Sequence, residues 1–178
     1  DELINELNQD ITVENIFHYI YSILFSPIYR SQYSEFLKVD YPRIPFTANP
    51  ELFLQMAALG ERLANLHLLK SDELNQPRVK YQGEGGNQII ERPVYNAEEK
   101  RLYINKNYYF ENLEPKVWTY QIGGYQVMDK YLKDRRGQTL EDPRHLIRVA
   151  TALAKTIEIQ EEIDAIYDGV EENLILFK

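Results

Sequence analysis

Three helix-start signals constrain the fold of this chain more than any other feature of its sequence. In each signal a residue that caps helices stands directly before a proline, as in Ser26-Pro27, Asn49-Pro50 and Asp142-Pro143. The polar side chain accepts a hydrogen bond from a free N–H of the first turn, and proline suits the first helical position because no donor is needed there. Helices therefore begin at fixed points both early and late in the chain.

Apolar side chains recur at spacings of three and four through the first part of the chain, which is the pattern of amphipathic helices. The pattern predicts one helix from Thr12, a second after Pro27, and a third from Pro50 to about Leu69. We expect the first two to form a helical hairpin and the third to pack nearby. Residues 12–70 are thus predicted to be a helical part.

The character of the sequence changes after Ser71. Residues 78–121 are rich in Val, Ile, Tyr and Trp and are interrupted by glycine and proline, a composition typical of short strands. Tyr95 and Leu102 bracket a polar Asn-Ala-Glu-Glu turn. These features predict a small antiparallel sheet of roughly three to five strands over residues 78–121.

Further helices are predicted over residues 125–168. A short helix over Tyr125–Arg136 is closed by Gly137, and a long helix runs from Pro143 to about Asp168. We expect the long helix to stop at Gly169, because glycine commonly follows the last turn of a helix. The tail, Glu171–Lys178, is expected to be a short extension.

The order of these elements predicts an α+β fold, with N-terminal helices, a small central antiparallel sheet and C-terminal helices in a single domain over residues 1–178. A hydrophobic fraction of 44% is enough for a real core. No apolar run is long enough for a membrane helix. The chain begins with Asp1 and no signal peptide follows, which suggests an excised or processed fragment. The absence of cysteine is compatible with a cytoplasmic location.

The formal net charge of −8 is unevenly distributed. Residues 1–20 carry five acids and no base, and residues 155–178 carry seven acids and two lysines. Residues 100–148 hold ten Lys and Arg against six Asp and Glu, a local charge of +4. A mildly basic region between acidic ends is a weak indication of DNA binding, and ordinary solvated surface explains it equally well.

Motifs that would carry catalysis are absent from the sequence. The histidines at 18, 67 and 145 are far apart, fit no zinc-binding pattern, and are expected to be structural or surface residues. The glycines between Gly83 and Gly86 lack the order of a nucleotide-binding turn. Adenine methylation normally uses an Asn/Asp-Pro-Pro-aromatic loop, and here Asn49-Pro50 is followed by Glu51. We predict that the chain catalyses nothing by itself and holds no cofactor or metal.

Six segments, taken in order, carry a recognisable pattern. They are Phe17–Arg30, Tyr41–Phe46, Leu59–Leu63, Leu66–Leu69, Ile122–Val127 and Leu132–Arg135. With this pattern the chain resembles, over residues 12–165, the C-terminal specificity domain of single-chain restriction–modification enzymes of the type ISP kind and of related adenine-specific methyltransferases.

The resemblance implies a target-recognition domain that positions duplex DNA for N6-adenine methylation, and for cleavage, by other domains of a larger polypeptide. The partners it implies are double-stranded DNA and the methyltransferase domain of the same polypeptide. S-adenosylmethionine would be the cofactor of that methyltransferase and not of this chain. The alternative is a structural module that braces the methyltransferase domain and makes little contact with DNA.

Physical reasoning nominates residues for DNA contact within the basic region. Lys130, Lys133 and Arg136 recur at spacing three, so they line one flank of the predicted short helix and suit contact with phosphates. Gly123 and Gly124 precede that helix, which would let a phosphate approach the free N–H groups of its first turn. Ordinary solvation of the flank is the alternative.

Arg43 is the candidate base reader. Two prolines enclose it within Tyr41–Phe46 and stiffen the segment, so that the arginine would be held toward a guanine edge or a phosphate. The alternative is a rigid strap between two helices, with Ile44 and Phe46 in the core. Tyr125, beside a predicted loop, is a candidate for stacking on a base.

Overall fold

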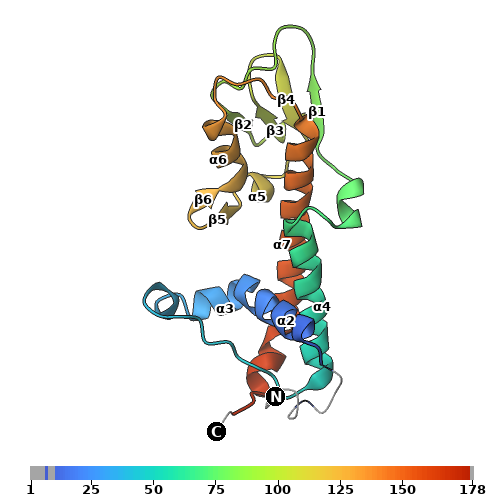
Figure 1. Cartoon of the computed structure of the whole chain (residues 1–178). Helices are drawn as coiled ribbons and strands as arrows, with labels where there is room; N and C mark the ends of the chain where they lie inside the picture. Colours follow the sequence, from blue (N-terminus) through green and yellow to red (C-terminus); the bar gives the residue numbers. More distant parts are fainter. Residues whose placement is uncertain (1–6, 8–10, 177–178) are drawn as a thin grey trace. The chain divides into compact units, whose positions relative to one another are not determined.

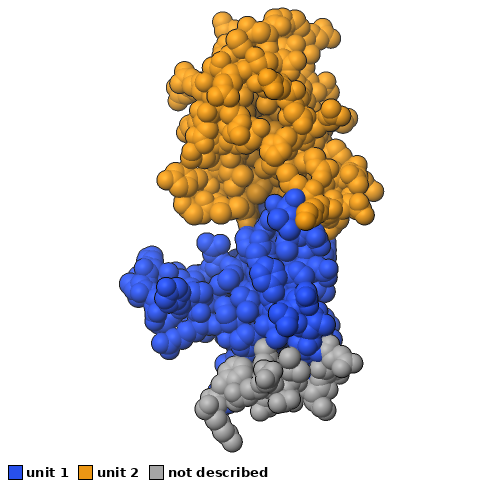
Figure 2. Space-filling model, in the orientation of Figure 1, with its two compact units in different colours: residues 1–68, 156–178 blue, residues 69–155 orange. Residues whose placement is uncertain are grey.

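The computed structural model describes residue 7 and residues 11–176 (Figure 1). The chain divides into two compact units, of which unit 1 comprises residues 1–68 and 156–178 and unit 2 comprises residues 69–155 (Figure 2). None of the described helices is long and apolar enough to cross a membrane.

Unit 1 is built from helices. Its elements are α2 (Val13–Phe25), α3 (Pro27–Gln32), the 3-10 helix η1 (Phe36–Lys38), α4 (Pro50–His67) and the last part of α7 (Pro143–Glu172). The side chains of Thr12, Ser26 and Asn49 each accept a hydrogen bond from a first-turn N–H, which confirms the helix starts predicted at these residues. The start predicted at Asp142-Pro143 is also confirmed, since α7 begins at Pro143. The second helix is shorter than its apolar pattern suggested, because α3 ends at Gln32 and η1 follows after a turn.

The core of unit 1 forms where α2 packs on α4. The ring of Tyr19 stacks on that of Phe53 with 4.4 Å between centroids, and both side chains are fully buried. A Cβ atom added at Gly60 would lie 1.8 Å from the backbone oxygen of His18. The two helices therefore approach each other through a position at which only glycine fits.

The tail of the chain contributes to unit 1, which corrects the expectation of an extension over residues 171–178. Thr47 and Leu174 form an antiparallel bridge, and the N–H of Ile175 donates to the carbonyl of Phe46 at 2.8 Å. These backbone pairings are long-range in sequence, so no local pattern in the tail could predict them. The last two residues of the tail lie outside the described residues.

The predicted stop at Gly169 is also wrong, since α7 continues through this residue to Glu172. A Cβ atom at Gly169 would lie 3.1 Å from Cδ2 of Leu52 on α4. Glycine at this position therefore allows close packing of two helices and does not terminate α7.

Unit 2 contains the antiparallel sheet. Its strands are β1 (Lys80–Gly83), β2 (Val94–Asn96), β3 (Arg101–Tyr103) and β4 (Tyr108–Glu111), in the order β1-β4-β3-β2. Tyr95 pairs with Leu102, which confirms the predicted turn. Phe110 pairs with Tyr81 on one side and with Leu102 on the other. This face of the sheet is the core face, because Leu102 and Phe110 are fully buried.

The remaining elements of unit 2 are η2 (Asp72–Asn75), α5 (Pro115–Trp118), β5 (Gln121–Ile122), β6 (Tyr125–Gln126), α6 (Val127–Asp134) and the first part of α7. The helix predicted over Tyr125–Arg136 is therefore shorter at both ends. Tyr125 belongs to β6, where it pairs with Ile122, and Arg136 follows the C-cap residue Arg135. Helices precede and follow the sheet along the chain, which confirms the α+β prediction.

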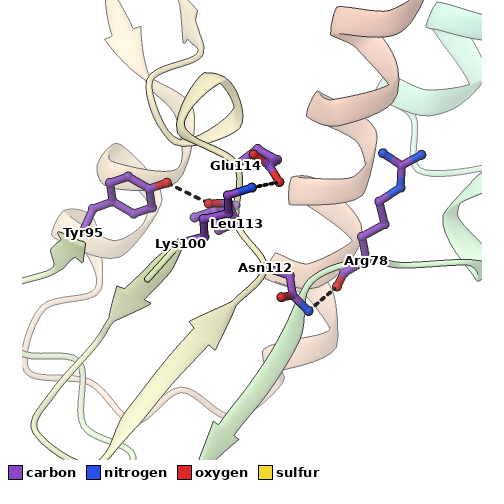
Figure 3. A network of polar contacts seen from close by, with 6 residues as sticks. All are labelled: Arg78, Tyr95, Lys100, Asn112, Leu113 and Glu114. Carbon is purple, nitrogen blue, oxygen red and sulfur yellow. Dashed lines mark hydrogen bonds and ion pairs between the residues drawn. The ribbon is translucent and has the colours of Figure 1, made fainter. Parts of the chain in front are cut away.

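A network of polar contacts closes one end of the sheet (Figure 3). The ammonium group of Lys100, in the turn between β2 and β3, lies 2.8 Å from a carboxylate oxygen of Glu114. The carbonyl of Leu113 accepts a hydrogen bond from the hydroxyl of Tyr95 at 2.7 Å, and its N–H donates to the carbonyl of Lys100 at 2.9 Å. These contacts fix the chain where it leaves β4. The loop from β1 to β2 and the turn from β3 to β4 lie at the opposite end of the sheet.

Gly60→Ala should destabilise the chain, although alanine favours a helix elsewhere. In an open helix the change gains about 1 kcal/mol, whereas here the methyl group must displace the backbone at His18, and overpacking costs about 1–3 kcal/mol or more. Urea unfolding followed by circular dichroism measures the difference. The control Gln55→Ala, at an exposed position of α4, should stay within about 0.5 kcal/mol of the parent. A Gly60→Ala variant as stable as the parent would contradict the close approach.

His67 is a half-buried side chain in unit 1. Its Nδ1 lies 2.8 Å from the hydroxyl of Tyr21, its Nε2 lies 2.9 Å from the hydroxyl of Thr156, and the ring of Phe25 packs 4.8 Å away between centroids. Burial lowers the pKa of His67 below its ordinary value, because the charged imidazolium would lose hydration. This histidine is structural, as expected.

Because of His67, we expect stability to fall as the pH falls. In the unfolded chain this imidazole binds a proton near pH 6.5, while in the folded chain it resists protonation until a lower pH is reached. Protons therefore favour unfolding from about pH 6.5 downward, until the lowered folded pKa has been passed. The free energy of unfolding, measured between pH 8 and pH 5, should fall more steeply for the parent than for His67→Gln. Equal pH dependence in the two proteins would show that His67 does not contribute.

Candidate nucleic-acid interface

The two units differ in formal charge. Unit 2 carries fifteen Lys and Arg against twelve Asp and Glu, which is +3, whereas unit 1 carries five against sixteen, which is −11. The acidic excess of the chain therefore belongs to unit 1 alone. Electrostatics repel a polyanion from unit 1 and permit its approach to unit 2.

The predicted basic flank on α6 is partly neutralised. Lys130 and Lys133 extend from the helix, but the Lys130 ammonium lies 2.5 Å from a carboxylate oxygen of Asp134 and the Lys133 ammonium lies 2.7 Å from that of Asp129. Arg136 lies beyond the end of α6, so the three cations do not form one helical flank. The i,i+4 spacing of the two acids was visible in the sequence and could have predicted these pairs.

These ion pairs do not remove the lysines as phosphate ligands. The Lys130–Asp134 pair is at the surface, with about half of each side chain exposed, and surface ion pairs contribute only about 0–1 kcal/mol. A phosphate can therefore replace the Asp134 carboxylate at small cost. Asp129 is only 18% exposed, but the Lys133 side chain is 65% exposed and has further N–H donors to offer a phosphate. Phosphate contact by Lys130 and Lys133 stays a prediction.

Gly123 and Gly124 form the two-residue turn between β5 and β6. Their φ values are 57° and 82°, and positive φ at both turn positions is the geometry of a type I′ hairpin turn. The glycines thus serve the hairpin, which differs from their expected role of opening the start of α6. The N–H of Val127, the first residue of α6, already donates to the carbonyl of Tyr120 at 3.1 Å. Tyr125 follows the turn with 63% of its surface exposed.

The segment that carries Arg43 lies in unit 1 and is anchored by its backbone. The hydroxyl of Tyr29 donates to the carbonyl of Arg43 at 3.0 Å, and that of Tyr19 donates to the carbonyl of Pro45 at 2.7 Å. The Arg43 side chain is 82% exposed, and its guanidinium group lies 4.9 Å from the ring centroid of Phe36. The backbone forms a strap and the arginine projects from it, so its role as a base reader stays a prediction.

The structure sorts the candidate residues by unit. Arg43 belongs to unit 1, whereas the other six candidates fall within residues 123–136 of unit 2. In that stretch the β5–β6 hairpin leads directly into α6. Gly123, Gly124 and Tyr125 are therefore close in the chain to the two lysines of α6, while Arg136 belongs to the loop that follows.

A group of loops in unit 2, of which the sequence nominated only Arg136, lies at the end of the sheet away from Lys100. Ile89 and Thr139 form an antiparallel bridge, so the loop after β1 pairs with the loop after α6. The turn between β3 and β4 joins them, because the N–H of Glu91 donates to the carbonyl of Ile104 at 2.8 Å. We name residues 84–92, 104–107 and 136–140 the loop edge; its first segment arches beyond β1 and β4 in Figure 1.

Asn105 ties the loop edge together. Its Nδ2 donates to the carbonyls of Asn87 and Ile89 at 3.0 and 2.9 Å, and its Oδ1 accepts from the N–H groups of Asn107 and Tyr108, both at 2.9 Å. An asparagine that caps its own turn is a local signal in the sequence. The two bonds from Asn105 to the loop after β1 have no such signal, so the sequence could not predict that these loops are joined.

The cations of the loop edge differ from those of α6. Arg92, Lys106 and Arg136 are all exposed, and none of them forms an ion pair with any residue in the described part of the chain. Their charged groups are available to a ligand without displacement of a carboxylate.

The outward face of the sheet carries an aromatic pair. Tyr103 and Tyr109 are cross-strand partners with 5.2 Å between ring centroids. The guanidinium group of Arg101 lies 4.6 Å from the ring centroid of Tyr109. Arg101 thus occupies a ring face that would otherwise be open to a stacking base.

An open groove of about 680 Å³ lies within unit 2 between α6 and the start of α7. Its wall includes Tyr131, Arg135 and His145, with the Arg135 guanidinium 3.8 Å from the ring centroid of Tyr131. Among the described residues, no group of three His, Asp or Glu side chains could hold a metal ion. The chemistry that unit 2 displays is that of recognition: cations, amides and half-buried rings.

Comparison with known proteins identifies relatives over most of the chain. The model of the Type ISP C-terminal specificity domain family matches residues 1–165. No curated protein matches the chain.

Three solved structures share the fold. They are a nuclease-deletion mutant of the Type ISP restriction-modification enzyme LlaGI in complex with a DNA substrate mimic (TM-score 0.65, 21% identity, 87% of this chain and 16% of that chain), the DrdV–DNA complex (0.71, 23%, 91% and 19%) and the ATP-dependent Type ISP restriction-modification enzyme LlaBIII bound to DNA (0.67, 22%, 91% and 12%). This chain therefore spans less than a fifth of the length of each of these proteins.

Asn105→Ala should loosen the loop edge. The change removes four hydrogen bonds, and each lost bond costs about 1 kcal/mol, so we expect a loss of about 2–4 kcal/mol in the free energy of unfolding. Hydrogen exchange should accelerate at the amides of Asn107 and Tyr108. The control Asn75→Ala removes one exposed 3.4 Å bond to Asp72 and should change stability by less than about 0.5 kcal/mol. Unchanged exchange at both amides in Asn105→Ala would show that other contacts hold these loops.

Proposed function

Because the chain belongs to the family of Type ISP C-terminal specificity domains, we propose that it selects the DNA sequence on which a longer restriction–modification polypeptide acts. A specificity domain is a recognition module rather than a catalytic one. The solved neighbours LlaGI, DrdV and LlaBIII were each determined with DNA or a DNA mimic, which supports a DNA partner for this fold.

The observation that carries the proposal is the division of charge between the units. Unit 2 has a formal charge of +3, while unit 1 has −11, and Arg92, Lys106 and Arg136 of unit 2 form no ion pair with any described residue. Contact with phosphates supplies much of the affinity of proteins for DNA. Unit 2 is therefore the part that we assign to duplex DNA.

The proposal extends to the longer polypeptide. We propose that another domain of it methylates adenine at N6 and binds S-adenosylmethionine, and that further domains cleave DNA. Within this chain, the glycines from Gly83 to Gly86 lead from β1 toward β2, and not from a strand into a helix, so this run does not suit a cofactor turn. A partner of this kind also implies action in the cytoplasm, where the DNA is.

Unit 1 favours a second role, that of bracing the methyltransferase domain. Val13 and Phe17 lie one turn apart on α2 and are 74% and 56% exposed. Exposed apolar side chains on a helix, in a unit with an excess of acidic residues, suit contact with a basic protein surface. We propose that this surface is part of the same polypeptide, so that recognition and bracing fall to different units of one chain.

The test measures binding of the chain to a labelled duplex by fluorescence anisotropy across a salt series. Non-specific affinity on the order of 10⁻⁴–10⁻⁶ M is expected. If Lys130 and Lys133 contact phosphates, alanine at either position should weaken binding to every duplex alike and reduce the slope of log affinity against log salt by about 0.9.

Lys38→Ala provides the matched control, because this lysine is also exposed and ion-paired but belongs to unit 1. It should leave the slope unchanged. Absence of salt-dependent binding would refute DNA recognition by the chain. If neither alanine variant changes the slope of log affinity against log salt, the phosphates bind elsewhere on unit 2.

A further inference from the structure

We propose that the loop edge reads bases in the major groove of the target duplex, with Arg92 as a specificity-determining residue. The inference rests on the proposed function of DNA recognition and names the side chains that perform it. Of the residues nominated from the sequence, only Arg136 belongs to the loop edge.

The backbone of the loop edge is held rigidly. The N–H of Ile90 donates to the carbonyl of Gln138 at 2.9 Å, and the N–H of Gly137 donates to the carbonyl of Ile90 at 2.8 Å. Asn105 supplies the four bonds described above. A base-reading side chain needs a fixed origin, because ordering a mobile loop on binding opposes affinity. Here that ordering has already taken place in the free chain.

Arg92 has a further constraint on its backbone. It directly precedes Pro93, and a residue before proline is restricted to extended conformations. The N–H of the preceding residue, Glu91, is bonded to the carbonyl of Ile104 at 2.8 Å. The side chain of Arg92 is exposed and makes no ion pair within the described residues. Its planar fork is thus free to form two parallel hydrogen bonds with one partner.

The exposed side chains of the loop edge match the chemistry of base edges. An arginine pairs with O6 and N7 of guanine, an amide with N6 and N7 of adenine, and a carboxylate accepts from N4 of cytosine. Arg92, Gln138, Glu84 and Glu91 are all exposed and offer these three kinds of group. Carboxylates would repel the phosphates on a surface that binds only the DNA backbone. On a surface that discriminates bases they can accept hydrogen bonds from amino groups.

The charge of the loop edge also fits a reader. Arg92, Lys106 and Arg136 stand against Glu84 and Glu91, a formal +1. This is enough to admit DNA without the strong attraction that would hold every sequence equally. At the other end of the sheet, Lys100 is engaged with Glu114 (Figure 3), so its charge is already compensated.

The test is a selection by the purified chain from a pool of duplexes with a randomised core, at low salt, followed by sequencing of the bound fraction. The variants are Arg92→Ala and Arg92→Lys, with Lys100→Gln as the control in the same unit. Arg92→Lys keeps the charge but removes the fork that recognises guanine in two bonds.

We expect the parent to enrich sequences with a fixed guanine at one position. Both Arg92 variants should lose about 5- to 150-fold of that discrimination, and Arg92→Lys should keep the parent's salt slope. Lys100→Gln should enrich the same sequences as the parent. Thermal unfolding of each variant checks that a loss of discrimination is not a loss of fold.

The outcomes separate this inference from the proposed function. No salt-dependent binding by the parent would sink both. Salt-dependent binding by a parent that enriches no sequence, or enrichment that Arg92→Ala leaves intact, would overturn the inference and leave DNA binding standing. Loss of discrimination in Arg92→Ala with full retention in Arg92→Lys would assign Arg92 to a phosphate, and would also overturn it.

Discussion

Backbone polar groups in an irregular loop must be hydrogen-bonded or exposed to water, and in unit 2 the side chain of Asn105 meets this need for two loops at once. Its oxygen closes its own turn and its nitrogen holds the loop that follows β1. The bridge between Ile89 and Thr139 then adds the loop that follows α6. Without these contacts the exposed end of the sheet would consist of three independent loops. With them it is one surface on which side chains have defined positions.

The division of charge makes the two units unlike in what they can bind. A net charge averaged over the chain is acidic and argues against a nucleic-acid partner, yet the acid is concentrated in unit 1. The helices of unit 1 bury aromatic side chains such as Tyr19 and Phe53 and keep Val13 and Phe17 exposed. The strands and loops of unit 2 expose amides and unpaired cations instead. Recognition of DNA and attachment to a protein partner therefore need not compete for one surface.

Much of the fold could be predicted from the sequence, because its signals are local. A capping residue before proline fixes a helix start, and alternation around Tyr95 and Leu102 fixes a turn between strands. The role of a glycine was harder to predict. The sequence around Gly169 does not distinguish a glycine that ends a helix from one that lets a neighbouring helix pack closely. The candidate site was predicted less well. Lys130 and Lys133 were nominated without their i,i+4 acids, and the pairings that hold the backbone beside Arg92 have no local signal because they join segments far apart in the chain.

The edges of the sheet have a consequence for how such a domain evolves. β1 and β2 are its outer strands, and an outer strand with free N–H and C=O groups invites pairing with another molecule. Here β2 is only three residues long and follows Pro93, which has no N–H to donate. Both features disfavour pairing of another strand with β2, although Val94 is 56% exposed. Substitutions in the loop edge can therefore accumulate beside a strand that does not seed aggregation. If the loop edge reads the target as proposed, single substitutions there can change the recognised sequence without lengthening the exposed strand edge at β2.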